Sequence, residues 1–404
     1  MKQIVHIYLL TILVGVGMVM FSACSSDNDY DSDSEREDKT ALSPLDVVAN
    51  QLNESMAGLD FKELDPLAET ITLNTRADGN TALSEFDVKL TSLIDLLKGD
   101  EGNGVTYGRR FSYQAFNSAL ELAFDLSAIL KSNGSSSSSW FGLKSEGSGE
   151  VTYTARNGQQ YRVSAEVKKG FGISHWNFDI TSASQFYIYK GDELLLRVIS
   201  NSEKNRPVWL PLLIRGDNFT GELLYRDYIV ALDYKQLHTH ERSVVLTYSK
   251  TADESPLLVM NTTLTDDADI LRLIKHDVTV EADFTVSALE GLFVFDGKVS
   301  NVNYLVVNGI KIAKYMREGT TEEECQSLVD DFNENLKLSL LIQTTPMGNI
   351  FMGIVRDAAN GRSYPTVMAN SPLTGNQDIP LTTMLKKLGI DIPEILQTVA
   401  QFDN

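Results

Sequence analysis

The sequence predicts an α+β protein in which N-terminal and C-terminal helices pack against a large curved antiparallel β-meander, half-barrel or barrel-like in form. Three observations lead to this fold class. Apolar residues recur at helical spacing in residues 43–131, they alternate with polar residues from residue 150 onwards, and about a dozen short strands fit into residues 150–314. So many strands cannot form one flat sheet, and we therefore expect strong curvature.

The first element is an export signal at residues 1–23. Its apolar run, residues 7–21, is shorter than the roughly 20 residues that a membrane-spanning helix needs. It ends in the small residues Ser22 and Ala23, followed by Cys24. Residues 24–42 are rich in Ser, Asp and Glu and predict a flexible acidic tether.

Residues 43–131 are predicted to be mainly helical. A first helix is expected to begin here, since Ser43 is a suitable capping residue and Pro44 suits the first helical position. Further amphipathic patterns follow, one running into Leu97 before Gly99 and one over residues 113–131. Residues 132–149 form a Ser/Gly-rich loop that marks an internal boundary.

Residues 150–356 are predicted to form an antiparallel β domain with one helix near residues 321–337. Asn157-Gly158 is a strong hairpin signal. Strands are expected as far as residues 299–307 and 309–314, and again at 338–343 and 350–356. The helix begins at a capping box formed by Thr321 and Glu324.

The remaining residues, 357–404, are predicted to form a loop and C-terminal helices. The loop covers residues 357–380, which are rich in Pro, Asn and Gly. The helices are expected at residues 381–388 and 393–402.

The charge balance excludes one class of partner. The chain has 35 basic and 55 acidic residues, a net charge of −20, and loss of Lys2 with the signal would leave −21. Nucleic-acid binding depends on basic patches, so we expect no nucleic-acid partner.

Cysteine usage predicts a fold without a disulfide. The chain contains only Cys24 and Cys325. Cys325 lies on the apolar stripe of its predicted helix, which indicates a buried, inert thiol.

Four aromatic and histidine residues are speculative ligand contacts. Trp140 and Phe141 in the Ser/Gly-rich loop could stack on sugar rings or enter a hydrophobic partner, and His175-Trp176 could form a ligand-stacking pair. For each pair the alternative is an ordinary structural role, with the aromatic rings packed into the core.

His238 and His240 are weak metal candidates, because residues two apart in a strand share a face. The alternative is a polar hairpin turn. We expect no resident metal or other cofactor. The nucleophile elbow, the phosphate-binding loop and the zinc helix motif are all missing from the sequence after residue 23, and we therefore expect no catalytic residues.

Phe21-Ser22-Ala23-Cys24 resembles the lipobox of bacterial lipoproteins. The acidic run of residues 27–33 resembles the export signal of Bacteroidetes-type surface lipoproteins, and the resemblance is limited to residues 1–33. It implies that Cys24 is lipidated and becomes the mature N-terminus. The protein would then be anchored in the outer membrane by its lipid and exposed at the cell surface.

These observations favour a non-catalytic binding module of the cell envelope, whose ligand would be a glycan, a protein or another envelope component. The alternative is a carrier of a lipid or other apolar ligand in a half-barrel cavity. Runs such as Leu194-Leu195-Leu196, apolar on both strand faces, fit that alternative. A hydrolase that uses acidic residues is a minor alternative.

Overall fold

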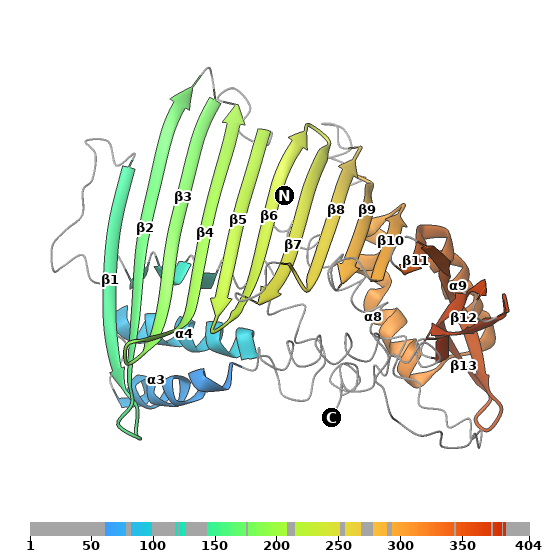
Figure 1. The fold of residues 1–404 in the computed structure, drawn as a ribbon, viewed down its shortest axis with the longest axis horizontal. Helices are drawn as coiled ribbons and strands as arrows, with labels where there is room; N and C mark the ends of the chain where they lie inside the picture. Colours follow the sequence, from blue (N-terminus) through green and yellow to red (C-terminus); the bar gives the residue numbers. More distant parts are fainter. Residues whose placement is uncertain are drawn as a thin grey trace. The chain divides into compact units, whose positions relative to one another are not determined.

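The computed structural model describes residues 61–77, 82–98, 118–119, 121–123, 125–126, 144–174, 177–207, 215–250, 255–267, 278–288, 293–342, 345–372, 375–381 and 383–384 (Figure 1). The chain divides into two compact units. The first contains Leu59–Gly99 and Arg109–Leu264, and the second contains Thr265–Asn404.

The strands are hydrogen-bonded in the order in which they occur in the chain, so the fold is an antiparallel meander. The order runs from β1 to β14 across a 14-stranded sheet. The antiparallel prediction is confirmed. Because β1 and β14 are both edge strands, the sheet is open. The prediction of a closed, barrel-like sheet is therefore wrong.

The elements with described bounds in the first unit are a short 3₁₀ helix, the α-helices α3 and α4, and the long strands of the meander; helical residues also occur within 118–126. These elements are η1 (Lys62–Leu64), α3 (Asp65–Ala77), α4 (Ala82–Lys98), β1 (Lys144–Thr154), β2 (Gln160–Ser174), β3 (Asn177–Lys190), β4 (Glu193–Pro207), β5 (Arg215–Tyr225), β6 (Tyr228–His238), β7 (Glu241–Lys250) and β8 (Leu258–Asp266).

One face of these strands, here called the inner face, carries the core of the first unit. Its side chains alternate with polar ones along each strand, as a half-buried sheet requires. The buried members include Tyr153, Tyr161, Val163, Phe186, Ile188, Leu196, Val198, Leu223, Tyr225 and Val230. Leu64, Leu67, Phe86 and Leu90 of the helices are buried with them, and each such side chain stabilises the fold by about 1.5–3 kcal/mol.

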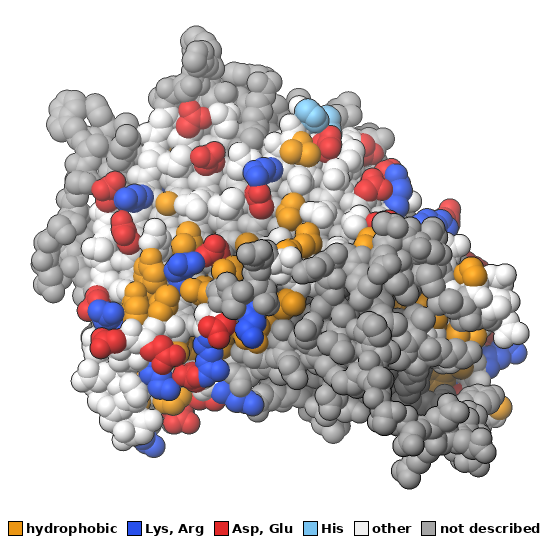
Figure 2. Space-filling view, in the orientation of Figure 1, with side chains coloured by type: hydrophobic (Ala, Val, Ile, Leu, Met, Phe, Trp, Pro, Cys, Tyr) orange, Lys and Arg blue, Asp and Glu red, His pale blue; other side chains and the backbone are white. Residues whose placement is uncertain are grey.

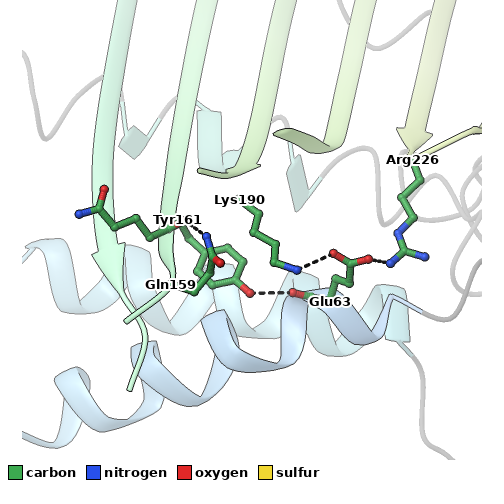
Figure 3. A network of polar contacts seen from close by, with 6 residues as sticks. Glu63, Gln159, Tyr161, Lys190 and Arg226 are labelled. Atoms are coloured by element: carbon green, nitrogen blue, oxygen red, sulfur yellow. Dashed lines mark hydrogen bonds and ion pairs between the residues drawn. The ribbon is translucent and has the colours of Figure 1, made fainter. Parts of the chain in front are cut away.

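Glu63 of η1 fastens the helical segment to this inner face (Figure 3). Its main-chain carbonyl accepts a hydrogen bond of 3.1 Å from the hydroxyl of Tyr161. Its carboxylate lies 3.0 Å from Nζ of Lys190 and forms a second ion pair with Arg226. One residue thus binds the ends of β2 and β3 and the turn that follows β5.

The second unit contains shorter strands and two described helices. Its elements are β9 (Val280–Ala288), β10 (Phe293–Val299), α8 (Val302–Glu318), α9 (Glu322–Asn335), β11 (Leu336–Ile342), β12 (Thr345–Asp357), β13 (Arg362–Asn370) and β14 (Asp378–Pro380). Helix α9 packs on β12 and β13 through Cys325, Leu328, Val329 and Phe332. Asn333 of α9 also donates to the carbonyl of Met352 at 2.7 Å and accepts from its N–H at 2.8 Å.

Several predicted elements are confirmed. Asn157-Gly158 forms the turn between β1 and β2, with Gly158 at a φ of 82°. Thr321 caps α9, because its side-chain oxygen accepts a hydrogen bond of 3.3 Å from the N–H of Glu324. Cys325 is completely buried, and burial raises the pKa of its thiol to about 11.

The strands predicted at residues 299–307 and 309–314 are wrong, since α8 occupies this region. Asn301 starts the helix by accepting a hydrogen bond of 3.2 Å from the N–H of Tyr304. Val302, Ile312 and Met316 recur at helical spacing. The many Val and Ile residues of the segment favoured strands over this weaker periodicity.

The loop predicted for residues 357–380 contains a further strand, β13, and the short strand β14. Pro365 and the turn residues around it are signals against a strand, but Pro365 pairs with Ile354 of β12 and is buried. Strand β1 likewise begins inside the predicted Ser/Gly-rich loop, at Lys144. The predicted helix near the first capping residue, Ser43, and the one at 393–402 lie outside the described residues.

Candidate functional site

The outer face of the first unit, opposite the inner face, changes in character along β3. The outward residues of β3 are Asp179, Thr181, Ala183, Gln185, Tyr187 and Tyr189. One half of this row is small or polar and the other half ends in two aromatic rings. Figure 2 looks onto this face, where hydrophobic side chains gather across the lower part of the strands and small or polar surface lies above them.

The polar half of the outer face is hollowed into an open groove. One part has a volume of about 500 Å³ and lies over the ends of β3, β4 and β5, with Asp179, Asn205 and Asn218 in its lining. A second part of about 310 Å³ extends towards β1 and β2. Thr181 and Glu203 line both parts, so the two are contiguous, and we call them together the outer groove.

The strand register explains why the floor of the outer groove is low. Ala183 lies directly between Lys168 of β2 and Asn201 of β4. Gly170 is paired with Thr181, and a Cβ atom at Gly170 would lie 2.6 Å from Oγ1 of Thr181, so the Thr181 side chain takes up the space that Gly170 leaves. The small side chain of Ala183 leaves room between its longer neighbours.

The polar side chains of the outer groove are held in place by one another. Asn205 donates a hydrogen bond of 2.5 Å to Oδ1 of Asp179, and Asn201 donates one of 3.3 Å to Oγ1 of Thr220. Oδ1 of Asn218 accepts a hydrogen bond of 3.2 Å from the backbone N–H of Gln236. The amide and carboxylate groups are thus oriented before any ligand arrives, which lowers the entropy cost of binding.

Beyond Gln185, the outward row of β3 ends in an aromatic stack. The rings of Tyr187 and Tyr189 are stacked with centroids 6.0 Å apart, and the guanidinium carbon of Arg162 lies 4.3 Å from the centroid of Tyr189. The hydroxyl of Tyr187 donates to Oε1 of Gln185, and burial raises the pKa of this tyrosine. Arg162 and Tyr187 already contact Tyr189, so the stack is a rigid wall rather than an open platform.

The structure does not bring the predicted site residues together. Cys24, Trp140, Phe141, His175 and Trp176 all lie outside the described residues. His238 ends β6 and His240 lies in the turn before β7, where both are exposed. Their placement confirms the polar hairpin turn, and the described residues contain no group of three or more His, Cys, Asp or Glu side chains arranged to hold a metal ion.

The outer groove itself is missing from the sequence-based prediction. Its sequence signal is a run of small and polar residues inside two long strands, Thr181 to Gln185 in β3 and Ser200 to Glu203 in β4. Chemically, the arrangement offers a row of hydrogen-bond donors and acceptors on a firm support. Both parts of the outer groove are lined mainly by polar side chains.

Comparison with known proteins gives no relatives: no protein-family model, curated protein or solved structure matches the chain. Among the described helices, none combines the length and the apolar character needed to cross a membrane.

Proposed function

We propose that this protein is a non-catalytic binding module of the cell envelope that holds an extended polar ligand in the outer groove. The observation that carries the proposal is the groove itself, about 500 Å³ and about 310 Å³ in its two parts, on a sheet face supported from behind by a packed core. Ligand sites are concave and have a small number of well-placed polar groups, and both features are present in the outer groove.

The long strands supply the rigidity that such a site needs. Strands β2 to β5, which carry most of the lining of the outer groove, are each hydrogen-bonded to a strand on either side. Sites built on strands are positioned more accurately than sites built on loops. The groove therefore loses little freedom on binding.

A matched pair of variants tests the proposal. Ala183 is half-buried on the floor of the outer groove, and Ala231 of β6 is half-buried on the same face but does not line it. The immobilised probes are a neutral polysaccharide, a sulfated polysaccharide and denatured casein. We expect at least one probe to retain the protein and the Ala231→Ile variant but not the Ala183→Ile variant. Equal retention of both variants, or no retention of the unchanged protein, contradicts the proposal.

The second part of the proposal concerns location. The lipobox-like Phe21-Ser22-Ala23-Cys24 and the acidic run behind it support a lipid anchor on Cys24 in the outer membrane, with the binding module exposed at the surface. Several acyl chains on one residue would hold the protein stably, because each buried methylene contributes about 0.8 kcal/mol. We expect Cys24→Ser to abolish incorporation of labelled palmitate and to release the protein from the membrane fraction. An unchanged membrane fraction would contradict the lipid anchor.

A further inference from the structure

Only side chains of the outer groove are available to form hydrogen bonds with a ligand. Backbone N–H and C=O groups on β2, β3 and β4 are engaged in ladders with strands on both sides. An extended polypeptide gains much of its affinity for a sheet from main-chain hydrogen bonds at a free edge. Strands β2, β3 and β4, which carry most of the lining, offer no such edge, so a peptide strand lying across them would leave its own backbone groups poorly paired.

The side chains that line the outer groove suit hydroxyl groups. A hydroxyl both donates and accepts, and an amide offers a donor and an acceptor side by side. Asn201, Asn205 and Asn218 provide amides, while Asp179 and Glu203 provide carboxylate acceptors. Neighbouring hydroxyls of a sugar ring can pair with both kinds of group at once.

The outward positions of the outer groove carry no excess of positive charge. Their charged residues are Lys168 and the three acids Glu146, Asp179 and Glu203, whereas Lys169 and Lys204 occupy inward positions in the strand register. Binding of a polyanion depends on an excess of positive charge. Without such an excess, and within a chain of net charge −20, the outer groove favours an uncharged ligand over a polyanion.

From these three features we infer that the ligand of the outer groove is an uncharged linear polysaccharide whose chain runs along β3 from Asp179 towards Tyr187. The inference deepens the proposed function and rests on it. At about 3.3 Å per residue the four steps from Asp179 to Ala183 that line the outer groove cover about 13 Å, and the eight steps to Tyr187 cover about 26 Å, enough for several sugar rings. The stack of Tyr187, Tyr189 and Arg162 lies at the far end of this row, beyond the groove lining, so the affinity should stop rising once the chain reaches it.

The test compares neutral xylan and mannan with heparin and denatured casein, by native electrophoresis in gels that contain each polymer. We expect retardation by at least one neutral polysaccharide, unchanged at high salt. Size-graded oligosaccharides of that polymer, titrated by calorimetry, should gain affinity with length and then reach a plateau.

Three variants complete the experiment. Ala183→Ile fills the groove floor, Glu203→Gln removes an exposed charged acceptor without touching the core, and Ala231→Ile is the matched control. We expect the first two to weaken binding about tenfold or more and the control to leave it unchanged. Far-UV circular dichroism identifies a variant that fails to fold, and Glu203→Gln keeps the test valid in that case.

The outcomes separate the inference from the function on which it rests. Retention by heparin or casein alone, lost in a folded Ala183→Ile variant, overturns the uncharged glycan and leaves the binding module standing. If a neutral glycan retains the protein and neither Ala183→Ile nor Glu203→Gln weakens that retention, both the inference and the proposed function are overturned. Retention by none of the four polymers also overturns the inference.

Discussion

The hydroxyl of Tyr153 on β1 donates a hydrogen bond of 2.5 Å to Oδ1 of Asp87 on α4. Asp87 is only 4 % exposed, and burial raises the pKa of its carboxyl group above the ordinary value of 3.8. The Tyr153 hydroxyl also has a raised pKa, because of burial and then of this bond. A buried acid and its donor therefore join the helical layer to the edge strand of the sheet.

Removal of the donor should destabilise the first unit. Tyr153→Phe leaves the buried carboxylate of Asp87 without this hydrogen bond, which costs about 1–3 kcal/mol of unfolding free energy. Tyr228→Phe on β6 is a matched control and should cost less than about 0.5 kcal/mol. Urea unfolding of both variants measures the difference, and equal midpoints would refute a special role for the pair.

The same pair predicts a pH dependence with a defined sign. Because the pKa of Asp87 is raised by folding, the folded state holds the proton more tightly than the unfolded state. The stability gained from protonation is therefore lost as the pH rises from about 3.8 through the folded pKa. The Asp87→Asn variant has no carboxyl group to titrate and does not lose stability in this way. The melting temperature of the variant minus that of the unchanged protein should therefore increase with pH. A difference that is constant from acidic to neutral pH would contradict the prediction.

Glu63 should contribute measurably to stability through its two ion pairs. Glu63→Gln removes the negative charge that faces Lys190 and Arg226 but keeps the main-chain bond to Tyr161. Both cationic side chains are partly exposed, so solvent screens the pairs and the loss should be about 1 kcal/mol. Glu69→Gln, on the exposed side of α3, is the control and should be nearly neutral. The prediction fails if the two variants unfold at the same urea concentration.

Arg162 and Tyr189 should show a coupling energy. The guanidinium of Arg162 lies over the Tyr189 ring, and cation–π pairs at partly exposed sites contribute about 0.5–1 kcal/mol. A double-mutant cycle with Arg162→Gln and Tyr189→Leu measures this energy from urea unfolding. Additive single-variant effects would show that the aromatic wall is a loose contact.

Parts of this architecture could be predicted from sequence because they depend on local signals. The Asn157-Gly158 turn, the His238-to-His240 turn and the cap of α9 at Thr321 each follow from a few neighbouring residues. Helix α8 and strand β13 were harder, since Val-rich and Pro-containing segments carry propensities that their packing overrides.

The candidate site could not be predicted, for a different reason. Gly170, Thr181 and Glu203 are unremarkable members of three separate strands, and only the register places them in one row. Register depends on the whole sheet and is invisible in any short stretch of sequence. The predicted aromatic candidate His175-Trp176 stays untested, as does Trp140-Phe141.

Photo-crosslinking tests the central claim most directly. A photoreactive amino acid is placed at Asn201, in the outer groove, or at Thr247, on the outward side of β7, and the protein is irradiated with a fluorescent neutral polysaccharide that it binds. We predict a crosslinked product from position 201 and none from position 247. Crosslinking from position 247 alone, or equally from both positions, would contradict a ligand held in the outer groove.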